Sequence, residues 1–295
     1  MRPIIGYTLG DQAGIGPEVI GKALASPELP QNADYMLIGE YIPCTPGQPT
    51  QATAEAAFRH LELAARALKE GSIDAVVTGP VCKEGLHSVG FRYPGQTEFF
   101  ADRLGCTDFA MCLSGDTLTV GLATIHVPLS DVPRLLCTDE LVRIGKLLAD
   151  FCRRIGKPEP RIALAGLNPH AGENGAFGDE ETRIIAPAVA RLRSECPAAR
   201  FSGPCVPDSV YREAAAGHYD AILAPYHDQG LIPLKMLDFD TAANITLGLP
   251  RLRISPDHGT AFGIAGKNIA SHASTLRAFQ LAVKSTMPAC NKTSN

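Results

Sequence analysis

The chain has 295 residues, 45% hydrophobic and 20% charged, which is enough apolar material for two ordinary domains or one large one. A formal net charge of −4, with no basic run longer than a pair, argues against nucleic acid or an anionic membrane as a partner. No apolar stretch reaches the roughly 18 residues of a membrane span, and the start lacks the apolar run of a signal peptide, so we expect a cytoplasmic protein.

Strand-like and helix-like patterns alternate along the whole chain. Strands are expected at 3–9, 35–38, 73–78, 109–114, 119–125, 161–165, 220–224 and 242–246. Helices are expected at 17–25, 51–70, 138–153, 179–194, 208–215 and 271–284. This alternation predicts an α/β protein with a mostly parallel sheet. The proline-rich stretch 41–50 is expected to be a loop, and the tail 288–295 to be frayed.

Two polar segments follow the first strands. Gly10-Asp-Gln-Ala-Gly-Ile-Gly-Pro-Glu18 leads from a strand into a helix, where it suits either an anion at the helix amino terminus or a plain tight turn. It is not the Gly-x-Gly-x-x-Gly dinucleotide fingerprint. Gln96 and Thr97, in Gly95-Gln-Thr-Glu98, suit either a crevice wall or the cap of a helix that begins near Phe99.

Three histidines each follow a short apolar run: His126, His170 and His227. Residues at the carboxyl ends of strands face the ligand crevice of an open α/β sheet, so three imidazoles there would suit a divalent metal. Their separations of 44 and 57 residues leave a second interpretation open, in which each histidine only forms structural hydrogen bonds. Nine scattered cysteines without a Cys-x-x-Cys pair are expected to be reduced thiols.

The last third of the chain carries further basic and glycine-rich segments. Lys235 follows an apolar stretch, where burial could lower its pKa or aim it at a phosphate, and Arg253 could grip an anion with two parallel hydrogen bonds. Either could equally be a solvated surface charge. Asp257-His-Gly-Thr-Ala-Phe-Gly-Ile-Ala-Gly-Lys-Asn268 is a glycine-rich loop suited to wrapping a nucleotide.

These segments, in this order, resemble the 4-hydroxythreonine-4-phosphate dehydrogenase family of pyridoxal phosphate biosynthesis. The matching motifs include Val-Thr-Gly-Pro-Val-x-Lys, Thr-x-His-Val-Pro-Leu, Gly-Leu-Asn-Pro-His-Ala-Gly-Glu, Tyr-His-Asp-Gln-Gly and Asp-His-Gly-Thr-Ala, and they cover nearly the whole chain. The resemblance implies two α/β/α domains with a central cleft, like isocitrate and isopropylmalate dehydrogenases. It also implies a cofactor-side domain of 1–95 plus 245–295, a metal, substrate and dimerisation domain of 96–244, and a homodimer with its active site near the interface.

The family's functional residues fall on definite positions of this chain. The resemblance implies that metal ligands are His126, His170 and His227, and that catalytic proton transfer belongs to Lys235 or Asp208. It implies that Gln96, Thr97, Lys235, Asn244 and Arg253 bind the small anionic substrate, and that His258, Gly259, Thr260, Ala261 and Asn268 bind the cofactor.

The implied reaction is an NAD-dependent oxidation of 4-phosphohydroxy-L-threonine to a 3-oxo acid, which decarboxylates to 3-amino-2-oxopropyl phosphate. NADP is the alternative cofactor, and the divalent metal could be zinc, magnesium, manganese or cobalt. The chain departs from the family pattern at Gln96, where the family has histidine, and in the short segment 41–50. Two alternatives therefore stay open: a paralogue that oxidises a different 3-hydroxy acid, phosphorylated or not, and a non-catalytic binding paralogue.

Overall fold

A computed structural model describes residues 2–286 of the chain, which divides into two compact units. The first unit runs to Thr107 and resumes at Asp240, and the second unit is Asp108–Phe239. The boundaries expected from the sequence, 95/96 and 244/245, differ from these by 12 and 5 residues respectively. The longer difference has a physical cause, because the helix that begins at Gln96 packs against the helix 51–70 and so stays with the first unit.

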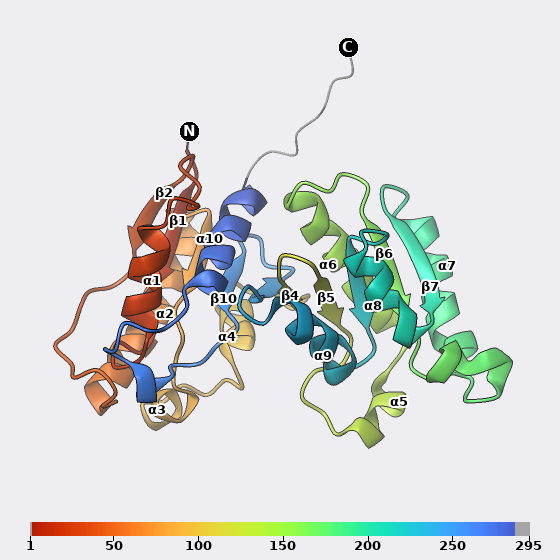
Figure 1. Ribbon diagram of the computed structural model, residues 1–295, viewed down its shortest axis with the longest axis horizontal. Helices are drawn as coiled ribbons and strands as arrows, with labels where there is room; N and C mark the ends of the chain where they lie inside the picture. The colour runs from red at the N-terminus through yellow and green to blue at the C-terminus, as the bar shows by residue number, and fades with distance from the viewer. Residues whose placement is uncertain (1, 287–295) are drawn as a thin grey trace, which may run out of the picture. The chain divides into compact units, whose positions relative to one another are not determined.

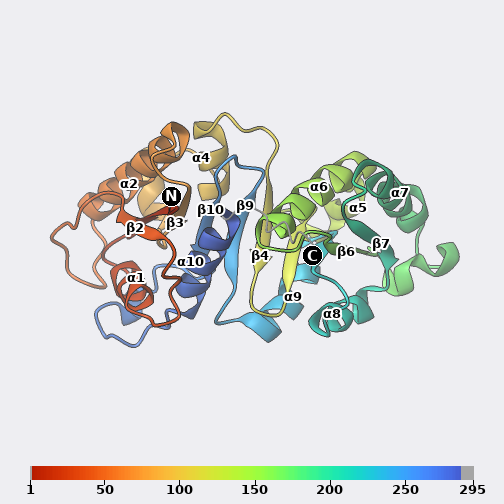
Figure 2. The same ribbon diagram turned by 90° about the horizontal axis from the view of Figure 1, so that it is seen from above.

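The first unit is a three-layer α/β/α arrangement (Figures 1 and 2). Its strands lie in the order β2-β1-β3-β10-β9, all parallel except the antiparallel β10–β9 pair. Figure 2 shows α1 and α10 over one face of these strands and α2 and α4 over the other. The strands are β1 (Ile4–Thr8), β2 (Asp34–Leu37), β3 (Ala75–Thr78), β9 (Ala243–Leu247) and β10 (Arg253–Pro256). The helices are α1 (Gly16–Leu24), α2 (Gln51–Glu70), α3 (Lys83–Ser88), α4 (Gln96–Arg103) and α10 (Ala273–Thr286).

The second unit repeats the three layers. Its strands lie in the order β4-β5-β8-β6-β7, with β4–β5 an antiparallel hairpin and the other pairs parallel. Helices α6 and α7 cover one face, and α8 and α9 cover the other (Figure 2). The strands are β4 (Ala110–Ser114), β5 (Thr119–Leu122), β6 (Arg161–Ala165), β7 (Arg200–Cys205) and β8 (Ala221–Ala224). The helices are α5 (Val132–Leu135), α6 (Thr138–Arg154), α7 (Ala186–Glu195), α8 (Pro207–Ala215) and α9 (His227–Asp238).

The local sequence accounts for most of these elements. Helix α2 starts with a capping box, in which Thr50 Oγ1 accepts from Thr53 N (3.2 Å) and Thr53 Oγ1 accepts from Thr50 N (3.1 Å). It ends at Gly71, whose φ of 76° is readily adopted only by glycine. The predicted mostly parallel α/β fold, with an α/β/α arrangement in each unit, is confirmed.

Several elements differ from the prediction, and α3, α5, α9, β7 and β10 were not predicted. The helix expected at 179–194 begins with a π-helix, Glu181–Ile185, because Pro187 has no N–H to donate to the preceding turn. Helix α9 was missed because Gly230 and Pro233 interrupt its pattern. Strand β7 was missed because Gly203 and Pro204 lie inside it. The expected frayed tail, 288–295, lies outside the described residues. No helix within 2–286 is long and apolar enough to cross a membrane.

Candidate active site

Two of the three predicted metal ligands lie next to each other in the second unit. The ring centroids of His126 and His227 are 5.6 Å apart. They meet because the neighbouring parallel strands β5 and β8 end together, and Thr124 holds the two following loops through a 2.8 Å bond from its Oγ1 to the carbonyl of Pro225. Both imidazoles line a cavity of about 190 Å³.

A carboxylate orients one of these imidazoles. His227 begins α9, and its Nδ1 lies 2.7 Å from Oδ1 of Asp228. A carboxylate on one ring nitrogen fixes the tautomer and leaves Nε2 with its lone pair available to a metal, an arrangement common among metal-binding histidines. His126 and His227 could therefore supply two of the ligands of a metal ion, which needs at least one more.

The third histidine lies on an unusual loop after β6. From His170 to Asn174 five consecutive residues have positive φ, between 40° and 80°, and four of them are not glycine. Such a left-handed turn costs roughly 1–2 kcal/mol per non-glycine residue, so other contacts must hold it. The buried Glu181 does so: its carboxylate accepts from Asn168 N (2.7 Å) and from Asn168 Nδ2 (3.0 Å).

The described part of a single chain does not assemble a complete metal site. Among residues 2–286, no group of three or more His, Cys, Asp or Glu side chains lies close enough together to hold a metal ion. The sequence predicted that the three histidines converge. Within one chain the structure brings His126 and His227 together and leaves His170 on the wall of a different cavity.

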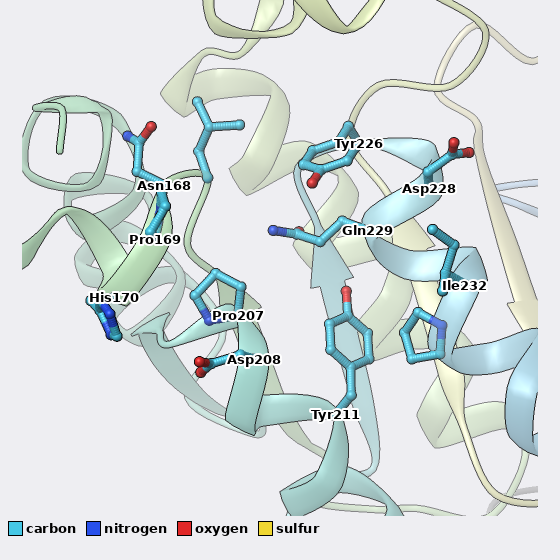
Figure 3. Close-up of a pocket in the computed structure, with 12 residues that line it drawn as sticks. Asn168, Pro169, His170, Pro207, Asp208, Tyr211, Tyr226, Asp228, Gln229 and Ile232 are labelled. Carbon is cyan, nitrogen blue, oxygen red and sulfur yellow. The ribbon is translucent and has the colours of Figure 1, made fainter.

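That larger cavity has a volume of about 530 Å³ and lies beyond the carboxyl ends of β6, β7 and β8 (Figure 3). Asp208, a predicted catalytic residue, lines it from the first turn of α8 and is exposed. Asp228 lines both cavities. Lys235, the other predicted proton-transfer residue, lies on α9 with an exposed side chain.

The predicted anion-binding residues gather in the first unit. The Arg253 side chain is 4% exposed; its Nε donates to Thr78 Oγ1 (2.9 Å) and its Nη1 to Asn244 Oδ1 (3.5 Å). Burial lowers the pKa of Arg253 to about 9, and the nearby Glu98 carboxylate only partly offsets this. A buried guanidinium whose positive charge is only partly balanced by a carboxylate is suited to binding an anionic ligand.

Helix α4 brings the other two predicted substrate residues to this cluster. Thr97 Oγ1 lies 3.3 Å from Oγ1 of Thr246, and Thr246 is the cross-strand partner of Arg253. Gln96 precedes Thr97, and no described residue is a hydrogen-bond partner of its buried Oε1. No side chain caps the start of α4, where Gly95 lies. The first backbone N–H groups of α4 therefore have no side-chain partner, and together with Arg253 they favour an anion.

The predicted cofactor loop is fixed against the turn before α1. The carbonyl of Thr260 accepts from Ile15 N (2.9 Å), and a Cβ on Gly14 would lie 2.6 Å from that carbonyl oxygen, so only glycine fits there. Ala261 and Asn268 have φ of 43° and 57°, while His258 and Gly259 lie at the start of the loop. The short segment 41–50 lies beside it, since a Cβ on Gly266 would come within 2.8 Å of Cβ of Pro46.

Several of these supporting residues escaped the sequence reasoning. Thr246 and Glu181 are ordinary residue types inside a strand and a helix, and no spacing marks them. Thr78 lies in the Val-Thr-Gly-Pro-Val-x-Lys motif but was given no role, although it ends a fully buried strand directly before Gly79-Pro80. The others become visible only through contacts between distant segments.

A family model described as pyridoxal phosphate biosynthetic protein PdxA matches residues 18–282. The chain belongs to this family. It is 39% identical to the 4-hydroxythreonine-4-phosphate dehydrogenase of Geobacter metallireducens, over 96% of this chain and 95% of the relative. It is 37% identical to the D-threonate 4-phosphate dehydrogenase of Pectobacterium atrosepticum, over 96% and 99%.

Solved structures agree with this placement in the PdxA family. The crystal structure of 4-hydroxythreonine-4-phosphate dehydrogenase from Klebsiella pneumoniae matches with a TM-score of 0.81 and 38% identity, over 97% of this chain and all of that one. Isocitrate dehydrogenase from Methylococcus capsulatus matches with a TM-score of 0.51 at 17% identity, over 96% and 87%, which shows the fold alone. The protein is thus an oxidoreductase of the PdxA family that acts on a CH–OH group.

Proposed function

We propose that this PdxA-family protein oxidises 4-phosphohydroxy-L-threonine with NAD and a divalent metal. The product would be a 3-oxo acid that decarboxylates to 3-amino-2-oxopropyl phosphate. The observation that carries the proposal is the pair of adjacent imidazoles, His126 and His227, with the Asp228 carboxylate hydrogen-bonded to Nδ1 of His227. In a family of dehydrogenases this pair suits a metal that binds the alcohol to be oxidised.

The metal and the cofactor would supply the chemistry that side chains lack. A divalent metal held by His126, His227 and His170 would supply Lewis-acid polarisation of the substrate, and NAD would accept the hydride from C3. In the same step the hydroxyl loses its proton. The C1–C2 bond of the resulting β-keto acid then breaks, carbon dioxide leaves, and a proton is taken up at C2.

The chain's own residues would bind the substrate and move protons. Arg253 and Asn244 would hold an anionic end of the substrate, and Thr97 would add a hydroxyl donor beside them. Asp208, at the cavity that His170 lines, and Lys235 on α9 are the candidates for taking the hydroxyl proton and returning one to C2. The loop from His258 to Asn268 would bind NAD, with NADP as the alternative.

A second substrate is favoured by Gln96. Glutamine cannot carry the positive charge that the histidine of the family pattern can, so it would hold a phosphate less strongly. Its buried Oε1 also finds no partner among the described residues. An unphosphorylated 3-hydroxy acid is therefore one alternative substrate. D-threonate 4-phosphate is another, because the Pectobacterium relative is named for it.

One assay separates these readings. NADH formation is measured with added divalent metal on 4-phosphohydroxy-L-threonine, D-threonate 4-phosphate and their unphosphorylated counterparts. The proposal predicts the highest kcat/KM on the first compound. Higher kcat/KM on the second would move the assignment to the alternative substrate, and no NADH from any compound would leave only the non-catalytic paralogue.

We also propose a homodimer, with the active site near its interface. Ile232, Met236 and Phe239 recur at helical spacing on and just after α9 and are 59%, 81% and 73% exposed. Such an apolar stripe is typical of a surface that another protein covers, and a second copy of the chain is the partner that could bring a third imidazole to His126 and His227.

Mixing two inactive variants tests this arrangement. If His170 of one subunit joins His227 of its partner, a mixed dimer of His170→Ala and His227→Ala chains keeps one intact site of two. Refolding the variants together at equal amounts should then restore about a quarter of the wild-type activity. No restored activity, with dimers formed, would place both histidines in sites made by a single chain.

A further inference from the structure

Gln12 connects two segments of the first unit through both ends of its side-chain amide. It lies in the turn between β1 and α1 and is 5% exposed. Its Nε2 donates to the carbonyl oxygen of Glu40 (2.8 Å), and its Oε1 accepts from the N–H of Ile42 (3.1 Å). The amide thus pairs with the backbone as a neighbouring strand would, and it holds residues 40–42 although they belong to no strand or helix.

Two further hydrogen bonds fix the ends of the segment 40–47. At its start the N–H of Glu40 donates to Nε2 of His60 (3.3 Å), a buried residue of α2. Burial lowers the pKa of His60, so the ring is uncharged at neutral pH and Nε2 keeps the lone pair that this bond requires. At its end the N–H of Gly47 donates to the carbonyl oxygen of Ala13 (2.7 Å), in the turn before α1. The segment is therefore held at both ends.

The same segment lies against the predicted cofactor loop. A Cβ on Gly266 would come within 2.8 Å of Cβ of Pro46, and a Cβ on Gly47 would lie 3.0 Å from the carbonyl oxygen of Phe262. At such close approach the loop cannot shift towards the segment unless the segment moves as well. The loop also accepts a hydrogen bond from the start of α1, through the carbonyl of Thr260. The shape of the loop therefore depends on two supports, the start of α1 and the segment.

We propose that Gln12 is a positioning residue for the cofactor. By holding the segment 40–47 in place, it keeps the loop 258–268 in the shape that binds the dinucleotide. The proposal rests on the proposed function, because it takes this loop as the NAD site. Both ends of the Gln12 amide are bonded to the backbone, so Gln12 acts through the segment and takes no part in hydride transfer. A loop that must first be ordered binds its ligand more weakly, because the cost of ordering opposes binding.

Steady-state kinetics of Gln12→Met test the proposal. Methionine has nearly the same length as glutamine but makes neither hydrogen bond. We expect KM for NAD to rise about tenfold, while KM for the hydroxy acid and kcat at saturating NAD stay within about twofold of the wild-type values. A loss of stability alone would not raise one KM selectively. An unchanged KM for NAD, or an equal rise of both KM values, overturns the proposal.

Two further variants complete this experiment. Gln51→Met is the matched control, since it removes an exposed amide that donates to Glu55 one turn further along α2, and it should leave both KM values unchanged. Gln12→Asn keeps the amide on a side chain one methylene shorter, which cannot reach Glu40 and Ile42 together. It should raise KM for NAD at least about threefold and serves as the test if Gln12→Met does not fold. A wild-type KM for NAD in Gln12→Asn would then overturn the proposal.

Hydrogen exchange gives a readout that needs neither cofactor nor substrate. The N–H of Gly47 is informative because its acceptor, the Ala13 carbonyl, is left intact by the substitution. In Gln12→Met this N–H should exchange about tenfold faster than in the wild-type protein if Gln12 holds the whole segment. The N–H of Val76, which donates to the carbonyl of Leu252, should exchange at the wild-type rate. Unchanged exchange at Gly47 overturns the role given to Gln12.

Calorimetric titration with NAD separates failure of this proposal from failure of the proposed function. If the wild-type protein forms no NADH from any substrate but binds NAD, the proposed function fails. The positioning role then still predicts that Gln12→Met binds NAD about tenfold more weakly than the wild-type protein does. Equal affinities, or no binding of NAD and NADP by the wild-type protein, would refute it. If NADH forms normally and Gln12→Met keeps the wild-type affinity for NAD, only the positioning role fails.

Discussion

Replacing Arg253 by methionine should make the ligand-free protein more stable while removing its affinity for anions. Arg253 is 4% exposed, and burial lowers its pKa to about 9. Relative to a guanidinium in water, this shift corresponds to roughly 5 kcal/mol by which burial disfavours the charged form. The destabilisation is fully present below pH 9, where the folded protein keeps Arg253 charged, and is relieved as the pH rises above that value.

The expected gain is smaller than this figure. Methionine keeps most of the buried volume but leaves Thr78 and Asn244 without the hydrogen bonds that Arg253 donates to them. Replacements of buried charges by apolar residues of similar size have stabilised proteins by about 1–4 kcal/mol. For a unit of this size each kcal/mol raises Tm by about 2–4 °C.

Thermal unfolding with and without inorganic phosphate checks both halves of this prediction. Phosphate should raise the Tm of the wild-type protein, because a ligand that binds only the folded state stabilises that state. The Tm of Arg253→Met should not change when phosphate is added. Arg92→Met is the matched control, since Arg92 is exposed and its loss changes the net charge equally. A lower Tm for Arg253→Met than for Arg92→Met, or an undiminished response to phosphate, would refute the reasoning.

Three further predictions concern the supports of the site. Arg103→Lys should lower the free energy of unfolding by about 1–2 kcal/mol in urea titrations. The reason is that lysine cannot reproduce the two parallel hydrogen bonds to Glu62 (2.8 and 2.6 Å) or the stacking of the guanidinium on Phe99. An unchanged urea midpoint would contradict this. Glu181→Gln should loosen the loop that carries His170 and weaken metal binding about 10- to 100-fold with the fold intact, as competition with a chelator would reveal. For Asp220, burial raises the pKa, but hydrogen bonds from its basic neighbours outweigh burial and lower the pKa overall. The ionised Asp220 therefore stabilises the fold, and this contribution should be lost as the pH falls below about 4. In Asp220→Asn the free energy of unfolding should fall less steeply with decreasing pH in this range, and an unchanged pH dependence would contradict the role given to Asp220.

The sequence predicted the alternation of strands and helices because apolar periodicity and helix caps are local. The long helix α2 is the clearest case, since a capping box starts it and Gly71 ends it. Helix α9 was missed for the opposite reason. Its Gly230 and Pro233 disfavour a helix locally, and packing against β5 and β8 overrides that preference.

The candidate site divides in the same way. Sequence motifs pointed to His126 and His227, and neighbouring parallel strands bring them together. Whether His170 joins them stays a prediction, because within one chain His170 lines a different cavity. Glu181 could not have been predicted, since only the fold places its carboxylate against Asn168, before the loop that carries His170.

The central claim is that a divalent metal at the histidines and NAD act together on a phosphorylated 3-hydroxy acid. The most direct measurement follows NADH formation from 4-phosphohydroxy-L-threonine by the purified protein, before chelation, after it and after divalent metal is added back. The account predicts that chelation abolishes NADH formation, that the metal restores it, and that His227→Ala neither binds the metal stoichiometrically nor turns over. Undiminished NADH formation by the chelated, metal-free protein, or by His227→Ala, would contradict it.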